Sequence, residues 1–98
     1  MNYYELQSLG FDNLKTDTLK AIEYFKEMLE IKGYYYDIGN TYVKIGYCYL
    51  LLKDYEKAVE YYEKAINDSY FNRILLSDGS WSNSWEIKQC GYYLLEIK

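Results

Sequence analysis

The chain has 98 residues, of which 50% are hydrophobic and 20% aromatic, and its net charge is −4. This composition predicts one small folded domain and excludes a disordered chain, because enough apolar surface is present to build a core. The acidic balance, without a clustered Lys/Arg run, argues against binding to nucleic-acid phosphates, and no stretch approaches the ~20 apolar residues needed to span a bilayer.

The N-terminal residues and the cysteines indicate the expected compartment. "MNYYELQSLG" has neither the basic nor the apolar region of a signal peptide, so we expect a cytoplasmic protein. Cys48 and Cys90 are the only cysteines, and neither has the spacing of a metal site. We expect both thiols to be reduced and half-buried, with a redox role as the alternative.

Two helices are predicted at the start of the chain, where apolar side chains recur at helical spacing. The first is expected at about Asn2–Leu14. The second is expected at Thr18–Ile31, with Thr16 or Asp17 as its N-cap and one apolar stripe along its length. Gly33 is the expected C-cap, since glycine tolerates the left-handed conformation in which many helices end.

Three further helices are predicted in the rest of the chain. The third, about Asp37–Leu52, is apolar on more than one side, which is typical of a helix packed on both faces. Asp54 is expected to cap the fourth, which runs to about Tyr70, or through Leu76 if the same helix continues. A last helix follows the turn "SDGS", with Asn83 at the N-cap of a capping box.

The second and fourth helices repeat one sequence. "DTLKAIEYFKEML" aligns without gaps on "DYEKAVEYYEKAI", so Ala21 matches Ala58 and Phe25 matches Tyr62. The helices before them align with an offset one residue larger, which makes the first turn one residue longer than the second. This alignment places Tyr4, Ser8 and Phe11 on Tyr42, Gly46 and Tyr49. A helical hairpin repeated every 37 or 38 residues predicts a solenoid.

The chain resembles the tetratricopeptide repeat family, whose pattern combines W-x₂-L-G-x₂-Y with A-x₃-F. The residues that fit this pattern are Tyr42, Ile45, Gly46, Tyr49, Ala58, Tyr62 and Ala65. The resemblance implies an all-α fold, a right-handed superhelical stack of antiparallel helical hairpins of the TPR-like α-α solenoid type. A plain antiparallel helical bundle is the alternative, although it does not explain the repeated order of Gly, Ala and aromatic residues.

The expected organisation is a single TPR-like domain over residues 1–98, with about two and a half repeats. Repeat one spans about 1–33, repeat two about 39–72, and a partial repeat or capping helix about 84–98. In the partial repeat, Ile87, Cys90, Gly91 and Leu94 align on the first helix of repeat two.

Small residues explain how the helices of a hairpin approach each other. Gly46 on the third helix and Ala58 on the fourth lack bulk, so we expect them to pack against one another. Ala65 is expected to face the next hairpin. Filling Ala58 with a large side chain is expected to cost about 1–3 kcal/mol through overpacking.

We expect no enzymatic activity and no cofactor or metal. The chain has no histidine, which excludes Ser-His and Cys-His nucleophile pairs. It has no Gly-rich phosphate-binding loop, and "SDGS" is too short to hold a metal or a phosphate, so it is a turn.

In the resembled family, the first helix of each hairpin lines a concave groove that binds a peptide or helix of a partner protein. The corresponding partner-binding residues here are Leu9 of repeat one, Asn40, Val43, Tyr47, Leu50 and Leu51 of repeat two, and Trp85 and Tyr92 of the last helix. Glu5, Asn13 and Lys88 extend this set. The alternative is that these residues pack in the core against the neighbouring hairpin.

The expected partner is an apolar peptide or an amphipathic helix, because the groove residues are aromatic and aliphatic. The family's two-carboxylate clamp needs Lys and Asn where this chain has Val43 and Tyr47, so we expect no binding of an Asp-Val tail. Two alternatives remain open. One is self-association as a homodimer through the C-terminal helix, whose apolar residues are Tyr92, Leu94, Leu95 and Ile97. The other is a small phage or bacterial inhibitor or immunity-type protein that binds a target protein.

Overall fold

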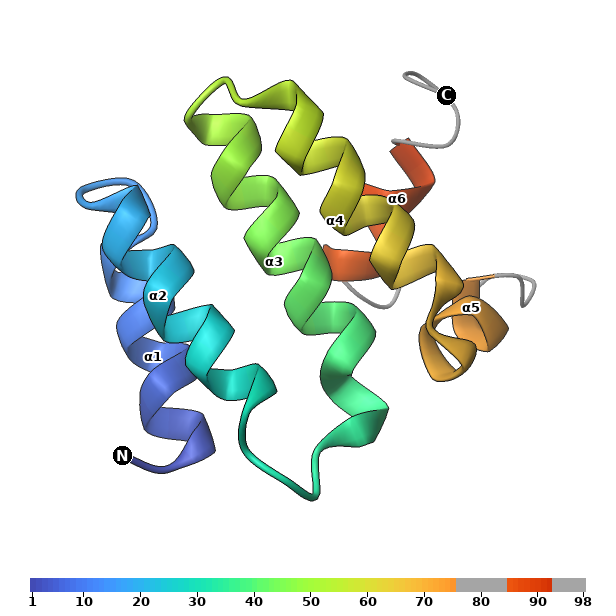
Figure 1. The fold of residues 1–98 in the computed structure, drawn as a ribbon, viewed down its shortest axis with the longest axis horizontal. Helices are drawn as coiled ribbons and strands as arrows, with labels where there is room; N and C mark the ends of the chain where they lie inside the picture. The colour runs from blue at the N-terminus through green and yellow to red at the C-terminus, as the bar shows by residue number, and fades with distance from the viewer. Residues whose placement is uncertain (76–84, 93–98) are drawn as a thin grey trace.

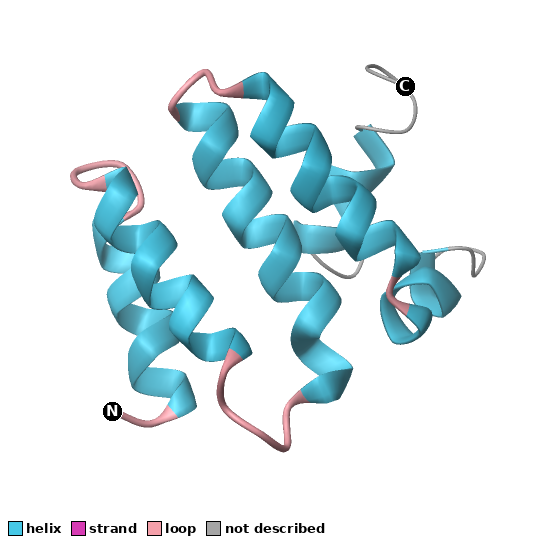
Figure 2. Ribbon diagram, viewed as in Figure 1, coloured by secondary structure: helices cyan, strands magenta, loops and turns pink. Residues whose placement is uncertain are grey.

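The computed structural model describes residues 1–75 and 85–92, and every regular element within them is a helix (Figures 1 and 2). This confirms the all-helical fold that the periodicity predicts. In chain order, the elements are α1 Tyr3–Asn13, α2 Thr18–Leu29, the 3₁₀ turn η1 Tyr35–Asp37, α3 Ile38–Leu51, α4 Tyr55–Asn67, α5 Ser69–Leu75 and α6 Trp85–Tyr92.

Side-chain caps fix where three of these helices begin. Asn2 accepts a hydrogen bond from the backbone N–H of Glu5 at 2.9 Å, and the Glu5 carboxylate accepts one from the Asn2 N–H, which completes a capping box at α1. Asp17 and Asp54 accept from the N–H groups three residues later, at the starts of α2 and α4. Asp17 is therefore the N-cap of α2.

Two predicted helix ends are wrong. The fourth helix stops at Asn67, because Asp68 is extended and its carboxylate accepts the N–H of Phe71 at 3.0 Å, which starts the separate helix α5. Gly33 is not the C-cap of α2, which ends at Leu29. It lies in the following turn with a φ of +98°, a conformation that favours glycine.

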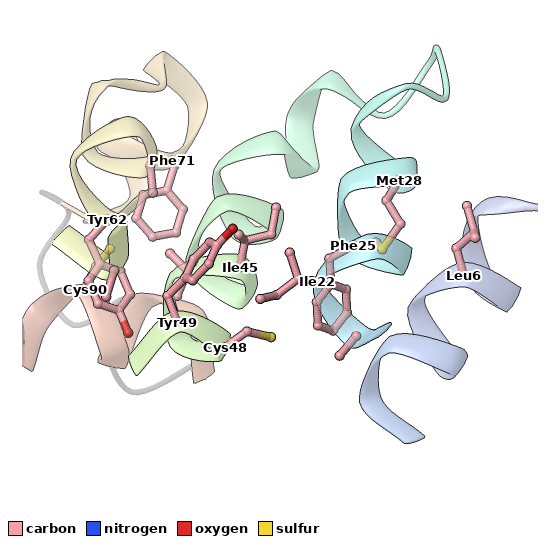
Figure 3. Packing of buried hydrophobic residues seen from close by; sticks show 14 of the residues in the cluster. Leu6, Ile22, Phe25, Met28, Ile45, Cys48, Tyr49, Tyr62, Phe71 and Cys90 are labelled. Carbon is pink, nitrogen blue, oxygen red and sulfur yellow. The ribbon is translucent and has the colours of Figure 1, made fainter. Parts of the chain in front are cut away.

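One core runs through the stacked helices. α1 packs on α2, α2 on α3, and α3 on α4, so each long helix contacts the next one along the chain (Figure 1). Figure 3 shows side chains of these helices meeting in one continuous cluster. Phe25 of α2, Ile45 of α3 and Ala65 of α4 are fully buried. Stacking the hairpins in this way buries apolar faces that neither hairpin covers alone.

Each hairpin has a glycine where its two helices lie close together. In the second hairpin, a Cβ added at Gly46 would lie 3.1 Å from the Tyr62 ring and 3.2 Å from the carbonyl oxygen of Ala58. This confirms the predicted packing of Ala58 against Gly46. In the first hairpin, a Cβ added at Gly10 would lie 2.7 Å from Cζ of Phe25, so Gly10 makes the equivalent contact.

The predicted alignment of the two first helices is therefore wrong by two residues. Gly10, not Ser8, is the counterpart of Gly46, and Ser8 is exposed. The stretch from Gly10 to Ala21 is one residue shorter than that from Gly46 to Ala58, where the alignment made it longer. The alignment failed because aromatic side chains were matched on sequence alone, whereas close helix packing selects the residue without a Cβ.

α6 lies against α3, α4 and α5 (Figure 1). At its start, Trp85 reaches the ring of Phe11 on α1. Near its other end, Cys90 is fully buried beside Tyr62 of α4 (Figure 3). The helix thus packs on the second hairpin and α5, and its Trp85 side chain reaches the first hairpin. Asn83, Leu94, Leu95 and Ile97, which enter the predictions for the C-terminal segment, lie outside the described residues.

Candidate functional site

Three aromatic rings from three helices gather around a hollow in the surface. Trp85 of α6 meets Tyr47 of α3 edge to face, with ring centroids 5.2 Å apart. On its other side it meets Phe11 of α1, at 6.4 Å. The hollow has a volume of about 280 Å³ and is lined by Phe11, Leu14, Lys15, Tyr47, Trp85 and Glu86. We name it the Phe11–Tyr47 hollow.

Phe11 and Tyr47 occupy equivalent places in the two hairpins. Each is the residue directly after the glycine of the close helix contact, Gly10 in α1 and Gly46 in α3. Because the glycine faces the second helix of its own hairpin, the next residue is turned about 100° around the helix and points to another side. The repeat therefore places two aromatic side chains on one face of the stack, where Trp85 contacts both.

A buried lysine lies next to this hollow. Lys44 of α3 is 3% exposed. Its Nζ donates a hydrogen bond to Oε1 of Gln7 at 3.3 Å and lies 3.4 Å from Oε1 of Glu86. It also lies 5.8 Å from the centroid of the Phe11 ring. The ammonium is thus held by groups from α1 and α6, and these contacts offset the free-energy cost of removing a cation from water.

The other end of α6 is anchored in the core. Burial raises the pKa of the Cys90 thiol to about 12, and burial likewise raises the pKa of the Cys48 thiol to about 12. Burial, and secondly the nearby Cys90, raises the pKa of the Tyr62 hydroxyl above its usual range. These groups remain neutral near pH 7, so they act as packing groups and not as nucleophiles.

The predicted partner-binding residues of α3 do not share one surface. Val43 is fully buried, so its inclusion was wrong, and the alternative of core packing holds for it. Leu50 is partly buried against the core, and Leu51 is 37% exposed. Asn40 donates a hydrogen bond to Asp37 Oδ1 at 2.7 Å, within the first turn of α3. Tyr47 is the residue of this group that lines the Phe11–Tyr47 hollow.

The predicted residues of the other helices are also divided. Trp85 joins Tyr47, as described above, and is 38% exposed. Leu9 lies in a separate shallow hollow on α1, together with Glu5. Asn13 donates to the Leu9 carbonyl at 2.9 Å and so serves the end of α1. Tyr92 belongs to α6, but its side chain lies outside the part that the structure describes.

Sequence reasoning missed Phe11, Leu14, Lys44 and Glu86. Phe11 was matched to Tyr49, a buried position, because the alignment of the first helices was shifted. The pair "LG" at residues 9–10, which repeats "IG" at residues 45–46, carried the correct signal. No comparable signal pointed to Lys44, since a lysine in an amphipathic helix is normally solvated.

The comparison with protein families decides what kind of stack this is. The chain matches the tetratricopeptide repeat over residues 9–68, a range that covers more than half of its length. The match begins in the last part of α1 and includes the whole of α2, α3 and α4. The chain belongs to the tetratricopeptide repeat family. No curated protein and no solved structure matches it.

Tetratricopeptide repeats generally mediate protein–protein interactions and are typically non-enzymatic. Within residues 1–75 and 85–92, no group of three or more Cys, Asp and Glu side chains is arranged to hold a metal ion. In the same residues, no helix is both long enough and apolar enough to cross a bilayer.

Proposed function

We propose that the protein is a non-enzymatic adaptor that binds a segment of a partner protein at the Phe11–Tyr47 hollow. The observation that carries this proposal is the meeting of Phe11, Tyr47 and Trp85 around a hollow on the side formed by the first helices of both hairpins. All three rings remain partly exposed. An aromatic surface of this kind gives a partner side chain a large apolar contact at low cost in conformational entropy.

The hollow suits an apolar anchor with polar groups around it. Leu14, Phe11 and Tyr47 provide its apolar lining, while Lys15 and Glu86 lie on its border. Such an apolar centre with a polar rim is the usual arrangement of an interface hot spot. An amphipathic helix or an extended peptide that inserts one large side chain fits this arrangement.

The proposal is tested by selecting peptides from a random phage-displayed library on the immobilised full chain. We expect the wild-type chain to enrich peptides that share an aromatic or aliphatic anchor. The double variant Phe11→Ala/Tyr47→Ala is expected to lose this enrichment while keeping its helical circular dichroism. Tyr35→Ala is the matched control, because Tyr35 is 59% exposed and lies outside the hollow.

Two results would overturn the proposal. One is a selection that enriches no common anchor on the folded wild-type chain. The other is an enrichment that survives Phe11→Ala/Tyr47→Ala but is lost in Tyr35→Ala, which would place partner binding on a different surface.

Self-association is a second candidate, and a row of exposed tyrosines supports it. Tyr35 contacts Tyr36 and Tyr70, with ring centroids 6.2 and 5.4 Å apart, and Tyr34 links Tyr36 to Tyr4. Exposed tyrosines of this kind are enriched at protein interfaces. Sedimentation equilibrium of the wild-type chain and of Tyr35→Ser/Tyr36→Ser tests this candidate. A monomer at high micromolar concentration would exclude it.

A further inference from the structure

We propose that the first turn of α6, which forms one wall of the Phe11–Tyr47 hollow, is an internal ligand of the surface formed by Phe11, Tyr47 and Lys44, and that partners displace it with a segment carrying an aromatic side chain next to a carboxylate. This inference rests on the proposed function and specifies the chemistry of the partner. It starts from two adjacent residues of α6, Trp85 and Glu86, which make different contacts in the same place.

Trp85 occupies the aromatic part of the site without being part of the core. Its ring lies nearly perpendicular to those of Phe11 and Tyr47, with an interplanar angle of 84° in both contacts. It nevertheless remains 38% exposed, whereas Phe25 and Cys90 are fully buried. The Trp85 ring is therefore seated on the surface of the stack, where a partner side chain can take its place.

Glu86 occupies the charged part of the site. Its carboxylate lies 3.4 Å from Lys44 Nζ, and the Lys44 side chain is 3% exposed. Among the residues that the structure describes, the other groups around this ammonium are the neutral amide of Gln7 and the face of Phe11. If Glu86 leaves without replacement, a cation remains buried with neutral contacts alone, which is unfavourable. A segment that displaces the first turn of α6 must therefore bring its own carboxylate.

The connection between α5 and α6 sets how tightly a partner must bind. Residues 76–84 join the two helices, so Trp85 and Glu86 cannot diffuse away from the hollow. Because both residues belong to the same chain as the hollow, they compete with a free segment as an intramolecular ligand. Free segments of the same chemistry are therefore expected to bind the wild-type chain measurably, and to bind more tightly once the internal ligand is removed.

A fluorescein-labelled peptide that spans residues 83–89, NSWEIKQ, tests the proposal on the full chain. Fluorescence anisotropy measures its binding to the wild-type chain and to Trp85→Ala/Glu86→Gln. We expect the variant to bind at least tenfold more tightly, because its hollow lacks the internal ligand. The control peptide NSWQIKQ is expected to bind the variant at least tenfold more weakly than NSWEIKQ. Adding Lys44→Met to the variant is expected to abolish the difference between the two peptides.

Equal binding of NSWEIKQ to both chains would overturn the proposal, and so would undetectable binding to a variant whose circular dichroism remains helical. If the double variant does not fold, Trp85→Ala alone replaces it, and binding no tighter than to the wild-type chain is then the contradicting result. The peptide library separates this inference from the proposed function. The library could enrich peptides that share an apolar anchor but have no acidic residue next to it, and Phe11→Ala/Tyr47→Ala could abolish this enrichment. That result would support the proposed function and overturn the aromatic–carboxylate chemistry proposed for the partner.

Discussion

The two tetratricopeptide hairpins differ in how tightly their helices close on the glycine. At Gly10, an added Cβ would lie 2.7 Å from Cζ of Phe25, a ring that is fully buried. At Gly46, the nearest atoms would be 3.1 Å away, on the edge of the Tyr62 ring. The first hairpin thus needs glycine at this position, whereas the second has nearly enough room for alanine.

This difference follows from what each hairpin packs against. α3 contacts α2 on one side and α4, α5 and α6 on others, so many contacts hold the second hairpin together. α1 packs mainly on α2. α1 therefore depends mainly on its contact with α2, whereas α3 shares its contacts among several neighbouring helices.

Phe25→Ala is expected to have the largest effect. It removes a fully buried ring from the one interface that holds α1 to α2. Truncations of this kind cost about 3–5 kcal/mol, because the cavity left behind collapses only in part. Urea unfolding followed by circular dichroism gives the change in the free energy of unfolding. A cost below about 1 kcal/mol would show that the first hairpin does not depend on this contact.

Replacing each glycine by alanine compares the two close helix contacts directly. Gly10→Ala is expected to destabilise the chain by about 1–3 kcal/mol, because overpacking against Phe25 outweighs the better helix propensity of alanine. Gly46→Ala is expected to lie within about 1 kcal/mol of the wild type, because the Tyr62 ring and the Ala58 carbonyl need to move by only a few tenths of an ångström while alanine favours the helix. The same urea measurement compares them.

A double variant sharpens the test at Gly10. Gly10→Ala is expected to cost less when Phe25→Leu is also present, because the shorter side chain frees space at the contact. Strictly additive changes in the free energy of unfolding would contradict a steric clash between the Cβ added by Gly10→Ala and the Phe25 ring. Equal changes for Gly10→Ala and Gly46→Ala would also contradict it.

The reactivity of the two thiols is expected to show a smaller difference, namely how readily α3 and α6 open to solvent. Cys48 and Cys90 are both fully buried, with pKa values raised to about 12 by burial. Cys90 is expected to react faster with Ellman's reagent at pH 8, because undocking of the short helix α6 exposes it, whereas Cys48 requires opening of the second hairpin. Rates are compared in the single variants Cys48→Ala and Cys90→Ala. A faster reaction of Cys48 would reverse the assigned order of stability.

The same pKa shifts predict how stability changes with pH. A thiol whose folded pKa is raised stabilises the folded state below its unfolded pKa, near 9, and this contribution is lost as pH rises towards 12. The free energy of unfolding is therefore expected to fall from about pH 9 upward, and to fall less steeply in Cys48→Ala.

The sequence was sufficient to predict the helices and the second hairpin. Apolar periodicity and the Asp54 cap gave α4 its start, and the spacing of Gly46, Ala58 and Tyr62 predicted a close contact that the structure confirms. The break at Asp68 was not predicted, because its carboxylate ends one helix by capping another. Whether α4 continues past Asn67 or a new helix begins depends on the backbone conformation at Asp68. The spacing of apolar residues carries no information about that conformation.

The candidate site was less predictable than the fold. Tyr47 and Trp85 were both predicted, but the burial of Val43 depends on how neighbouring helices cover α3. Phe11 was missed through the shifted alignment. Lys44 was missed because its partner Glu86 lies 42 positions later in the chain, and pairing across that distance depends on where α6 docks.

The contact of Trp85 with both hairpins is measurable by nuclear magnetic resonance. In the variant Trp81→Phe, Trp85 is the sole tryptophan, so its indole protons are assigned without ambiguity. We predict nuclear Overhauser effects from this indole to the ring protons of both Phe11 and Tyr47. Effects to Tyr47 alone, or to neither ring, would contradict the account.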